Sequence, residues 1–457
     1  MDSLQERTDQ VFVRTNMLTP SAPPKRTSGA IGWVRANFFS SWGSALATII
    51  VLYISYRIAV PAINFIFVNG VWSGSSRDVC TNTAQGGVQP PEWFGGCWIY
   101  VHSYFAQFIY GFYPAPERWR ADLVFALFFG GLIPLLVPRV PFKAFNIIFM
   151  IVVFPVATFI LLTGGHVHFL GFLLPNWLIS PSPLKFAIDY AILTAIALAA
   201  GYAIARGTQS DPRPTLHGIT GAMGLFAIVL ILMAMNFGLQ PVETSRWGGL
   251  LLTLVLAVTG MAVALPLGII LALGRRSKMP VVRLLSTIFI EFWRGVPLVS
   301  VLFMASVMLP LLLPEGVSFD NLLRALVGVA MFSAAYMAEV VRGGLQAIPK
   351  GQYEGAKALG LTYWQMMGMI VLPQALKIVI PGIVNIFISL FKDTTLVLTI
   401  GLFDFLGQIQ ASFADPNWAS SVQVVTAYSF AAGMYFIFCF SMGQYSKFME
   451  RRLDTGH

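Results

Sequence analysis

The chain has 457 residues, of which 56% are hydrophobic and only 11% are charged. A soluble domain usually carries about 25% charged residues, so this composition excludes an ordinary soluble protein and predicts the lipid bilayer as the main solvent. The formal net charge of +9 would suggest nucleic acid as the partner of a soluble protein. Here its meaning depends on where the charges fall relative to the apolar segments.

A helix needs about 20 mainly apolar residues to cross a bilayer, and several segments along the chain meet this requirement. They are predicted to be helices because lipid cannot satisfy backbone polar groups, and the alternation of a membrane β-strand is absent. The predicted spans are 44–68, 121–138, 144–163, 186–205, 216–237, 247–273, 284–313, 322–341, 374–403 and 423–446. The predicted fold class is therefore an all-α polytopic membrane protein with about ten transmembrane helices.

The distribution of Lys and Arg predicts the orientation of these spans. With the N-terminus inside, most of the 29 basic residues fall in inside segments, as cytoplasmic loops require. We therefore expect residues 1–43 and the C-terminus to be cytoplasmic, and we expect the first span to be a retained anchor rather than a cleaved signal. This bias explains the basic charge without nucleic acid.

Two of the three cysteines, Cys80 and Cys97, lie in the predicted external loop 70–118. Disulfides persist outside the cytoplasm, so we predict that these two cysteines pair, with two free thiols as the alternative. No CxxC motif or Cys/His cluster is present, so we expect no metal site.

The most informative stretch lies between two predicted spans, on the side assigned to the cytoplasm. Pro349 and Gly351 interrupt the preceding structure, residues 352–359 can then form a short helix, and Gly360 can end that helix in a left-handed conformation. The pattern predicts a short amphipathic helix on the cytoplasmic face, and Pro373 marks the return toward the membrane.

This stretch resembles the EAA loop of bacterial ABC import permeases. The resemblance rests on Glu354-Gly355-Ala356, Gly360, Ile370 and Leu372-Pro373 at the family's spacing, with Gly355 in place of the central alanine. It implies that the loop 342–373 is a coupling helix seated in a groove of the ATPase subunit. The residues it assigns to that contact are Gln352, Tyr353, Glu354, Gly355, Ala356, Gly360 and Leu361.

Three further stretches resemble the histidine/glutamine, or polar amino-acid, branch of these permeases: IEFWRGVPL (290–298), AYMAEVVRGGLQAIPKGQ (335–352) and SLFKDTTLV (389–397). The resemblance implies a type I importer permease core of five helices over 241–457. The preceding extension, 44–240, has about five further spans and resembles that of the M-type (AapM-like) membrane subunits of general L-amino-acid importers. We expect these spans to pack around the periphery of the core.

The resemblance also implies a complex in the inner membrane. Two ATPase subunits, a second permease that makes a heterodimer, and a periplasmic amino-acid-binding protein are the expected partners. The chain lacks G-x-x-x-x-G-K-[ST], so it has no P-loop. It is therefore expected to be a transporter subunit and not an enzyme, with no bound cofactor of its own and with ATP and Mg in the partner ATPase.

Ionisable residues inside spans are costly and often functional. Glu291 and Arg294 can pair at i, i+3, and Glu339 and Arg342 repeat that spacing just before the loop. We interpret both as structural or gating ion pairs, with the structural reading favoured for the first pair and a role in fixing the base of the loop for the second.

A mixed polar cluster occupies the ninth span. Its members are Ser389, Lys392, Asp393, Thr394 and Thr395. A free amino acid carries an ammonium and a carboxylate group, so charges of both signs with hydroxyl groups suit a substrate pathway. A Lys–Asp pair that stabilises a break in the helix explains the cluster equally well.

Two other classes compete with this interpretation. An ion-coupled secondary transporter would show matching broken helices in two repeats, and no such pair is evident. A membrane enzyme or a subunit of a respiratory complex would need haem or metal ligands, and of the five histidines only His166 and His168 lie close together.

Overall fold

The computed structural model describes residues 29–137, 139–165, 173–174, 178–180, 182–207, 212–312 and 319–453. His166, His168 and residues 1–28 lie outside these described residues. Contacts divide the described chain into two compact units, one of residues 29–72 and 78–97 and one of residues 73–77 and 98–453. Over these residues the structure is helical, with isolated β-bridges in place of strands.

The first unit contains α1 (Gly29–Phe38), α2 (Trp42–Ile63) and the π-helix η1 (Asn64–Val68), followed by the 3-10 helices η2 (Arg77–Cys80, whose Arg77 belongs to the second unit) and η3 (Thr83–Gln85). Ser41 caps α2 through a reciprocal bond with Ser44, which satisfies two backbone donors that the first helical turn leaves free. No residue of α2 is buried, as expected of an apolar helix surrounded by lipid.

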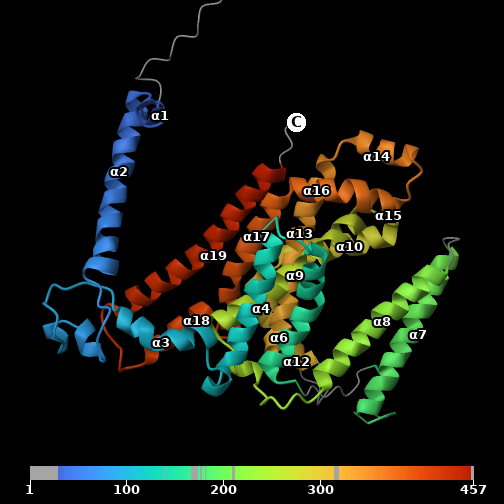
Figure 1. Ribbon diagram of the computed structural model, residues 1–457, viewed down its shortest axis with the longest axis horizontal. Helices are drawn as coiled ribbons and strands as arrows, with labels where there is room; N and C mark the ends of the chain where they lie inside the picture. Colours follow the sequence, from blue (N-terminus) through green and yellow to red (C-terminus); the bar gives the residue numbers. More distant parts are fainter. Residues whose placement is uncertain are drawn as a thin grey trace, which may run out of the picture. The chain divides into compact units, whose positions relative to one another are not determined.

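The first half of the second unit consists of short and long helices from the N-terminal extension. They are α3 (Trp98–Tyr110), η4 (Ala115–Glu117), α4 (Arg118–Leu136), α5 (Lys143–Ile148), η5 (Phe149–Val153), α6 (Phe154–Thr163), α7 (Pro183–Gly207), α8 (Pro212–Ala234) and η6 (Thr244–Arg246). Helices α7 and α8 lie side by side as a hairpin (Figure 1). Helices α4 and α6 contribute Ala121, Val124 and Leu162 to the same buried cluster as α9.

The second half of this unit holds the helices from residue 249 onward, which are called the core below. Its helices are α9 (Gly249–Arg275), α10 (Pro280–Gly295), α11 (Leu298–Phe303), η7 (Met304–Met308), α12 (Leu309–Leu312), α13 (Asn321–Ala347), α14 (Lys350–Ala358), α15 (Tyr363–Met366), η8 (Met367–Val371), α16 (Leu372–Ile378), α17 (Ile380–Asp393), η9 (Thr394–Ile400), α18 (Phe405–Ala411), η10 (Ser412–Ala414) and α19 (Gln423–Leu453). Helices α9 and α13 pack against each other along their length at its centre (Figure 1). Small side chains at their contact, such as Ala264 and Ala334, are fully buried.

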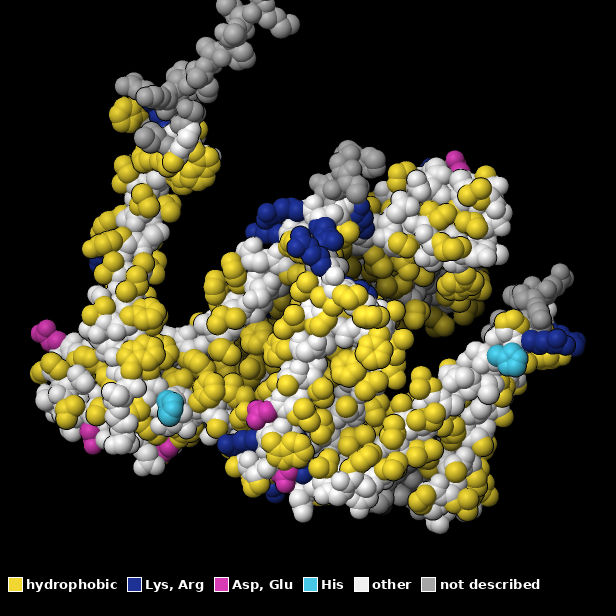
Figure 2. All heavy atoms as spheres, in the orientation of Figure 1, with side chains coloured by type: hydrophobic (Ala, Val, Ile, Leu, Met, Phe, Trp, Pro, Cys, Tyr) yellow, Lys and Arg dark blue, Asp and Glu magenta, His cyan; other side chains and the backbone are white. Residues whose placement is uncertain are grey.

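Nine helices among the described residues are long and apolar enough to cross a membrane, or ten if one bent pair is counted as a span. The bent pair corrects the continuous span predicted over 284–313: α10 meets the α11–α12 segment at 102°. The bend falls at Val296 and Pro297, where the proline forces an extended backbone on the residue before it. Figure 2 shows hydrophobic side chains over the sides of the helices, with Lys and Arg side chains mostly near helix ends.

Candidate functional site

The predicted loop helix is α14, and its ends are set by two residues with restricted or unusual backbones. It begins after Pro349 and is followed by Gly360, whose φ of +72° is the left-handed conformation that the sequence predicts there. The N–H of Leu361 donates to the carbonyl of Ala356 at 3.2 Å, and the N–H of Gly360 donates to that of Lys357 at 2.9 Å. This pair of bonds is the Schellman arrangement, so the helix has a defined end.

One face of α14 is attached to the core. Ala356 is 2% exposed and packs in a buried cluster with residues of α9 and α13. The Tyr353 hydroxyl donates to the carbonyl of Leu345, at the end of α13, at 3.1 Å. Arg276, at the end of α9, donates to that same carbonyl at 2.8 Å and to the Tyr353 hydroxyl oxygen at 3.2 Å. The loop helix is therefore tied to two core helices at once.

The opposite face of α14 and the start of α15 are open. Leu359, which directly follows α14, is 78% exposed, and Trp364 of α15 is 73% exposed. Glu354 and Gly355 lie on the same exposed helix. At its edge, Gln352 accepts a hydrogen bond from Gln374 at 3.1 Å. A surface of apolar and charged groups is thus presented away from the core.

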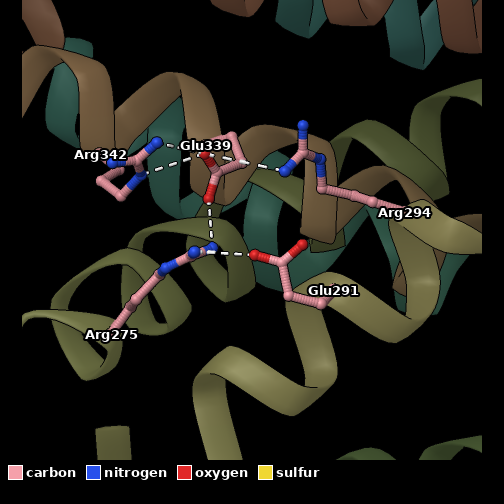
Figure 3. Close-up of polar contacts among 5 residues, drawn as sticks. All are labelled: Arg275, Glu291, Arg294, Glu339 and Arg342. Atoms are coloured by element: carbon pink, nitrogen blue, oxygen red, sulfur yellow. Dashed lines mark hydrogen bonds and ion pairs between the residues drawn. The ribbon is translucent and has the colours of Figure 1, made fainter.

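Next to this loop, five charged side chains from three helices form one cluster, shown in Figure 3. Glu339 of α13 lies at its centre and receives Arg342 at 2.6 Å, Arg275 at 2.7 Å and Arg294 at 3.8 Å. Arg275 also contacts Glu291 of α10 at 2.7 Å. The Glu339 side chain is only 16% exposed, so water screens these pairs less than it screens surface pairs.

This geometry corrects one predicted pair. Glu291 takes Arg275 as its partner and not Arg294, whose guanidinium reaches Glu339 instead (Figure 3). The reason is that Arg275, on the last turn of α9, lies between α10 and α13, where it can contact both carboxylates. Glu339 and Arg342 do make the i, i+3 contact that their spacing allows.

The residues of the candidate substrate pathway do not all face one space. Lys392 and Thr395 line a wide-open surface cavity of about 350 Å³ together with residues of α18 and α19. Thr394 is buried, and its hydroxyl donates to the carbonyl of Phe391 at 2.9 Å. The Thr395 hydroxyl bonds back to Lys392 in the same way at 3.0 Å. These bonds occur where α17 tightens into the 3-10 helix η9, and Ser389 lies exposed one turn earlier.

The predicted external loop contains a covalent bond. Cys80 and Cys97 form a disulfide with their Cα atoms 5.5 Å apart, and both side chains are 1% exposed. Cys439 is a free thiol in α19. Among the described residues, no group of three His, Cys, Asp or Glu side chains is placed to hold a metal ion.

Three residues that matter in this geometry were not singled out from the sequence. From the sequence, Arg275 and Arg276 are two of the basic residues in the inside segments. Two consecutive arginines at the end of a span, followed by a helix that contains a glutamate, could have indicated an ion pair between them. Asp404 is fully buried and caps α18, accepting from the N–H of Gly407 at 2.9 Å. Burial raises the pKa of its carboxyl group to about 6.

The fold and this site define a class. Apolar helices that could cross a membrane carry a charged cluster at the end of α9, and beside it a short anchored helix is followed by exposed apolar side chains. This arrangement is typical of the transmembrane subunit of a transporter whose movement is driven by a separate protein.

Comparisons with known proteins agree. Residues 264–455 match the family described as binding-protein-dependent transport system inner membrane component. An inner membrane amino-acid ABC transporter permease, YhdY of Escherichia coli (strain K12), is 42% identical over 440 residues, which cover 95% of this chain and 97% of the relative. The glutamate/glutamine/aspartate/asparagine transport system permease BztC of Rhodobacter capsulatus is 40% identical over 458 residues, covering 98% and 99%. A solved amino acid ABC transporter with histidines has 28% identity and a TM-score of 0.40, covering 45% of this chain and 92% of that one.

The chain belongs to the amino-acid ABC transporter permeases. It is a multi-pass inner membrane subunit of an ATP-driven importer, and such permeases work with separate ATPase subunits and a second permease. It is therefore a transport component and not itself an enzyme. The relatives give no support to an ion-coupled secondary transporter.

Proposed function

We propose that the exposed face of α14 is the surface on which the ATPase subunit docks, and that Tyr353 and Arg276 pass its motion to the core. The single observation that carries this proposal is the two-sided character of α14. Tyr353 on one face is bonded to Leu345 and Arg276, while Glu354 and Gly355 are exposed, and so is Leu359, which directly follows the helix and is 78% exposed. Leu359 and Trp364 are both exposed on this one loop, and apolar side chains gathered at the surface are typical of a site that a partner covers.

Arg275 and Arg276 are neighbours at the end of α9. A displacement of α14 acts on Arg276 through Tyr353 and is passed along the chain to Arg275, which contacts Glu339. Because Glu339 joins α9, α10 and α13, these three helices are expected to move together when the loop is pushed. The cluster thus acts as the base of the coupling loop. It transmits motion and does not contact the solute.

The other subunits of the transporter are inferred from the family. Two ATPase subunits bind ATP and Mg, this chain binds no cofactor, a second permease completes a heterodimer, and a periplasmic binding protein delivers the solute. The loop and both termini face the cytoplasm. The match to the family described as binding-protein-dependent and the excess of Lys and Arg in the segments assigned to the inside support this arrangement.

For the solute, we propose amino acids that include glutamate and its amide. The support is the 40% identity, over nearly the whole length of both chains, to the permease named for glutamate, glutamine, aspartate and asparagine. The candidate pathway of Ser389, Lys392, Asp393, Thr394 and Thr395 suits such solutes, because the Lys392 ammonium on the cavity wall can pair with a carboxylate.

The first experiment is purification of the chain from its native membranes in mild detergent, with mass spectrometry of everything that accompanies it. The wild-type chain is expected to bring a P-loop ATPase and a second permease in stoichiometric amounts. Leu359→Asp, at the exposed residue that directly follows α14, is expected to lose the ATPase and keep the second permease. Lys447→Ala, at an exposed position of α19, is the matched control and should keep both. Retention of the ATPase by Leu359→Asp would place the docking surface elsewhere.

A further inference from the structure

Helix α3 lies outside the residues that the family description covers, and yet it packs tightly on the permease core. It has 13 residues, or about 20 Å of helix, which is too short to span a bilayer. Five of its side chains are buried, and it contacts α9, α18 and α19 (Figure 1). It lies within the segment 70–118, which the sequence predicts to be an external loop between two spans.

Three polar side chains of α3 reach one short segment of the core. Tyr100, Tyr104 and Gln107 follow the i, i+4, i+7 spacing of one helical face. Their contacts are the Tyr100 hydroxyl with the Ser412 hydroxyl, the Tyr104 hydroxyl donating to the Asp415 carboxylate, and Gln107 Nε2 donating to Gln408 Oε1 at 3.0 Å. All three partners lie within 408–415, on α18 and the turn that follows it.

The backbone of the core is shaped to accept α3. Gly249, the first residue of α9, has a φ of +63°, and a Cβ atom there would lie 2.3 Å from the carbonyl oxygen of Phe108. Only glycine allows that approach. The Phe108 side chain is fully buried and lies 5.9 Å from the ring of Phe430 in α19. The position of α3 is therefore defined by close packing as well as by polar contacts.

The segment that α3 holds forms part of the cavity beside Lys392. Leu406 of α18 lines this cavity together with Lys392, Thr395 and Tyr428. Helix α18 is short, and its first turn is capped by the buried Asp404, to which the Tyr435 hydroxyl donates at 3.3 Å. Helix α18 also contacts α9 and α19, and α3 adds side-chain hydrogen bonds at its far end, at Gln408 and Ser412.

We propose that α3 is a brace for this cavity, with Tyr104 and Gln107 as positioning residues that hold α18 as its wall. The role of the cavity in solute passage rests on the proposed function, but the bracing itself is a property of the fold. The N-terminal extension thereby acts on the core at the end of α9 opposite to α14, because α18 contacts the start of α9 and α14 is tied to its end.

The bracing can be tested in the full-length chain in lipid nanodiscs. Leu406→Cys in a Cys439→Ser background supplies a thiol in the cavity wall, and its rate of reaction with a water-soluble maleimide reports how firmly α18 is held. Tyr104→Phe and Gln107→Ala are each expected to raise that rate about threefold to tenfold, as the loss of one hydrogen bond allows. Asp415→Asn keeps an oxygen acceptor for Tyr104 and should react like the parent chain.

His102→Ala is the matched control, because His102 is an exposed residue of the same helix. Equal rates for Tyr104→Phe, Gln107→Ala and this control would overturn the proposal. In proteoliposomes with the ATPase and binding protein, the two variants are also expected to raise KM for L-glutamate uptake more than they lower kcat. A wild-type complex that takes up no glutamate would count against the proposed function alone, because the labelling rates are measured without solute.

Discussion

Glu339 forms ion pairs with three arginines. Two of these arginines, Arg275 and Arg294, lie on helices other than that of Glu339. With the carboxylate in place, three positive groups face two negative ones, since Glu291 is the other acid. Removing one partner of a buried ion pair costs about 3–5 kcal/mol, and the cost at this 16% exposed side chain should fall near the lower end of that range.

We therefore predict that Glu339→Gln lowers the melting temperature of the purified chain and abolishes ATP-dependent uptake. The reason is that Arg275 and Arg294 then repel each other and the helices that carry them separate. Glu450→Gln, at an exposed site of α19, should leave both quantities unchanged. Thermal melting and uptake in proteoliposomes are the measurements. A Glu339→Gln chain with normal melting and normal uptake would show that the cluster transmits nothing.

Asp404 leads to a prediction about pH. Its carboxyl group is fully buried, and burial raises its pKa to about 6 from an ordinary value near 4. The folded state thus favours the protonated acid. Its contribution to stability is complete below about pH 4 and is lost as the pH rises through 6, because the folded state must then hold a buried carboxylate.

Asp404→Asn removes this ionisation and keeps an oxygen that can accept from the N–H of Gly407. We expect the variant to be more stable than the parent chain at pH 8 by about 1–3 kcal/mol and to lose that advantage below pH 5. Chemical or thermal unfolding at several pH values tests this. An Asn variant that is less stable at pH 8 would mean that the carboxylate charge itself stabilises α18.

At the scale of single elements, α14 allows a test that separates helix stability from docking. Gly355 lies on the exposed face, and a Cβ atom added there meets nothing within 4 Å. Alanine in place of glycine stabilises a helix interior by about 1 kcal/mol. We predict that Gly355→Ala leaves ATPase binding intact and does not lower uptake, because the helix stays in place and the added methyl group is small.

Glycine to leucine at the same position provides the contrast. Gly355→Leu should raise helix propensity almost as much but place a large group on the proposed docking face. We expect it to weaken co-purification of the ATPase, which Gly355→Ala does not. If both variants bind the ATPase normally, the exposed face near Gly355 is not part of the contact.

Much of this element structure could be predicted from the sequence. The apolar runs locate the spans, and Pro349 and Gly360 locate the ends of α14, because each signal is local. The bend between α10 and α11 was missed although Gly295 and Pro297 mark it, since the apolar run continues across it. The partners of Glu291 could not be predicted. Arg275 lies 16 residues away, and only the packing of α9 between α10 and α13 brings it close.

Helix α3 shows the same limit more clearly. Its aromatic residues and glutamine read as part of an external loop, and no local pattern relates Tyr104 to Asp415, 311 residues further along the chain. The glycine at position 249 has a structural reason only once the carbonyl of Phe108 is seen against it. The sequence therefore predicts that the extension and the core exist, but it does not predict the contacts between them.

At the scale of the whole molecule, the permease core has two distinguishable ends. Helix α9 has 27 residues, or about 40 Å at 1.5 Å per residue, which exceeds the hydrocarbon thickness of a bilayer. Its first residues contact α18, where the Thr253 hydroxyl accepts from the N–H of Phe405, and its last residues contact α14. We therefore predict that the two short helices lie on opposite sides of the membrane.

The excess of Lys and Arg predicts which side is which, and α14 should face the cytoplasm. We expect a thiol introduced by Lys357→Cys, in a Cys439→Ser background, to react with a membrane-impermeant maleimide only in inside-out vesicles. A thiol introduced by Ala419→Cys, between α18 and α19, should react only in right-side-out vesicles. Both positions are exposed, so the bilayer alone decides the outcome. Reaction of both from one side would contradict α9 as a span, and the reverse pattern would overturn the orientation while leaving the fold intact.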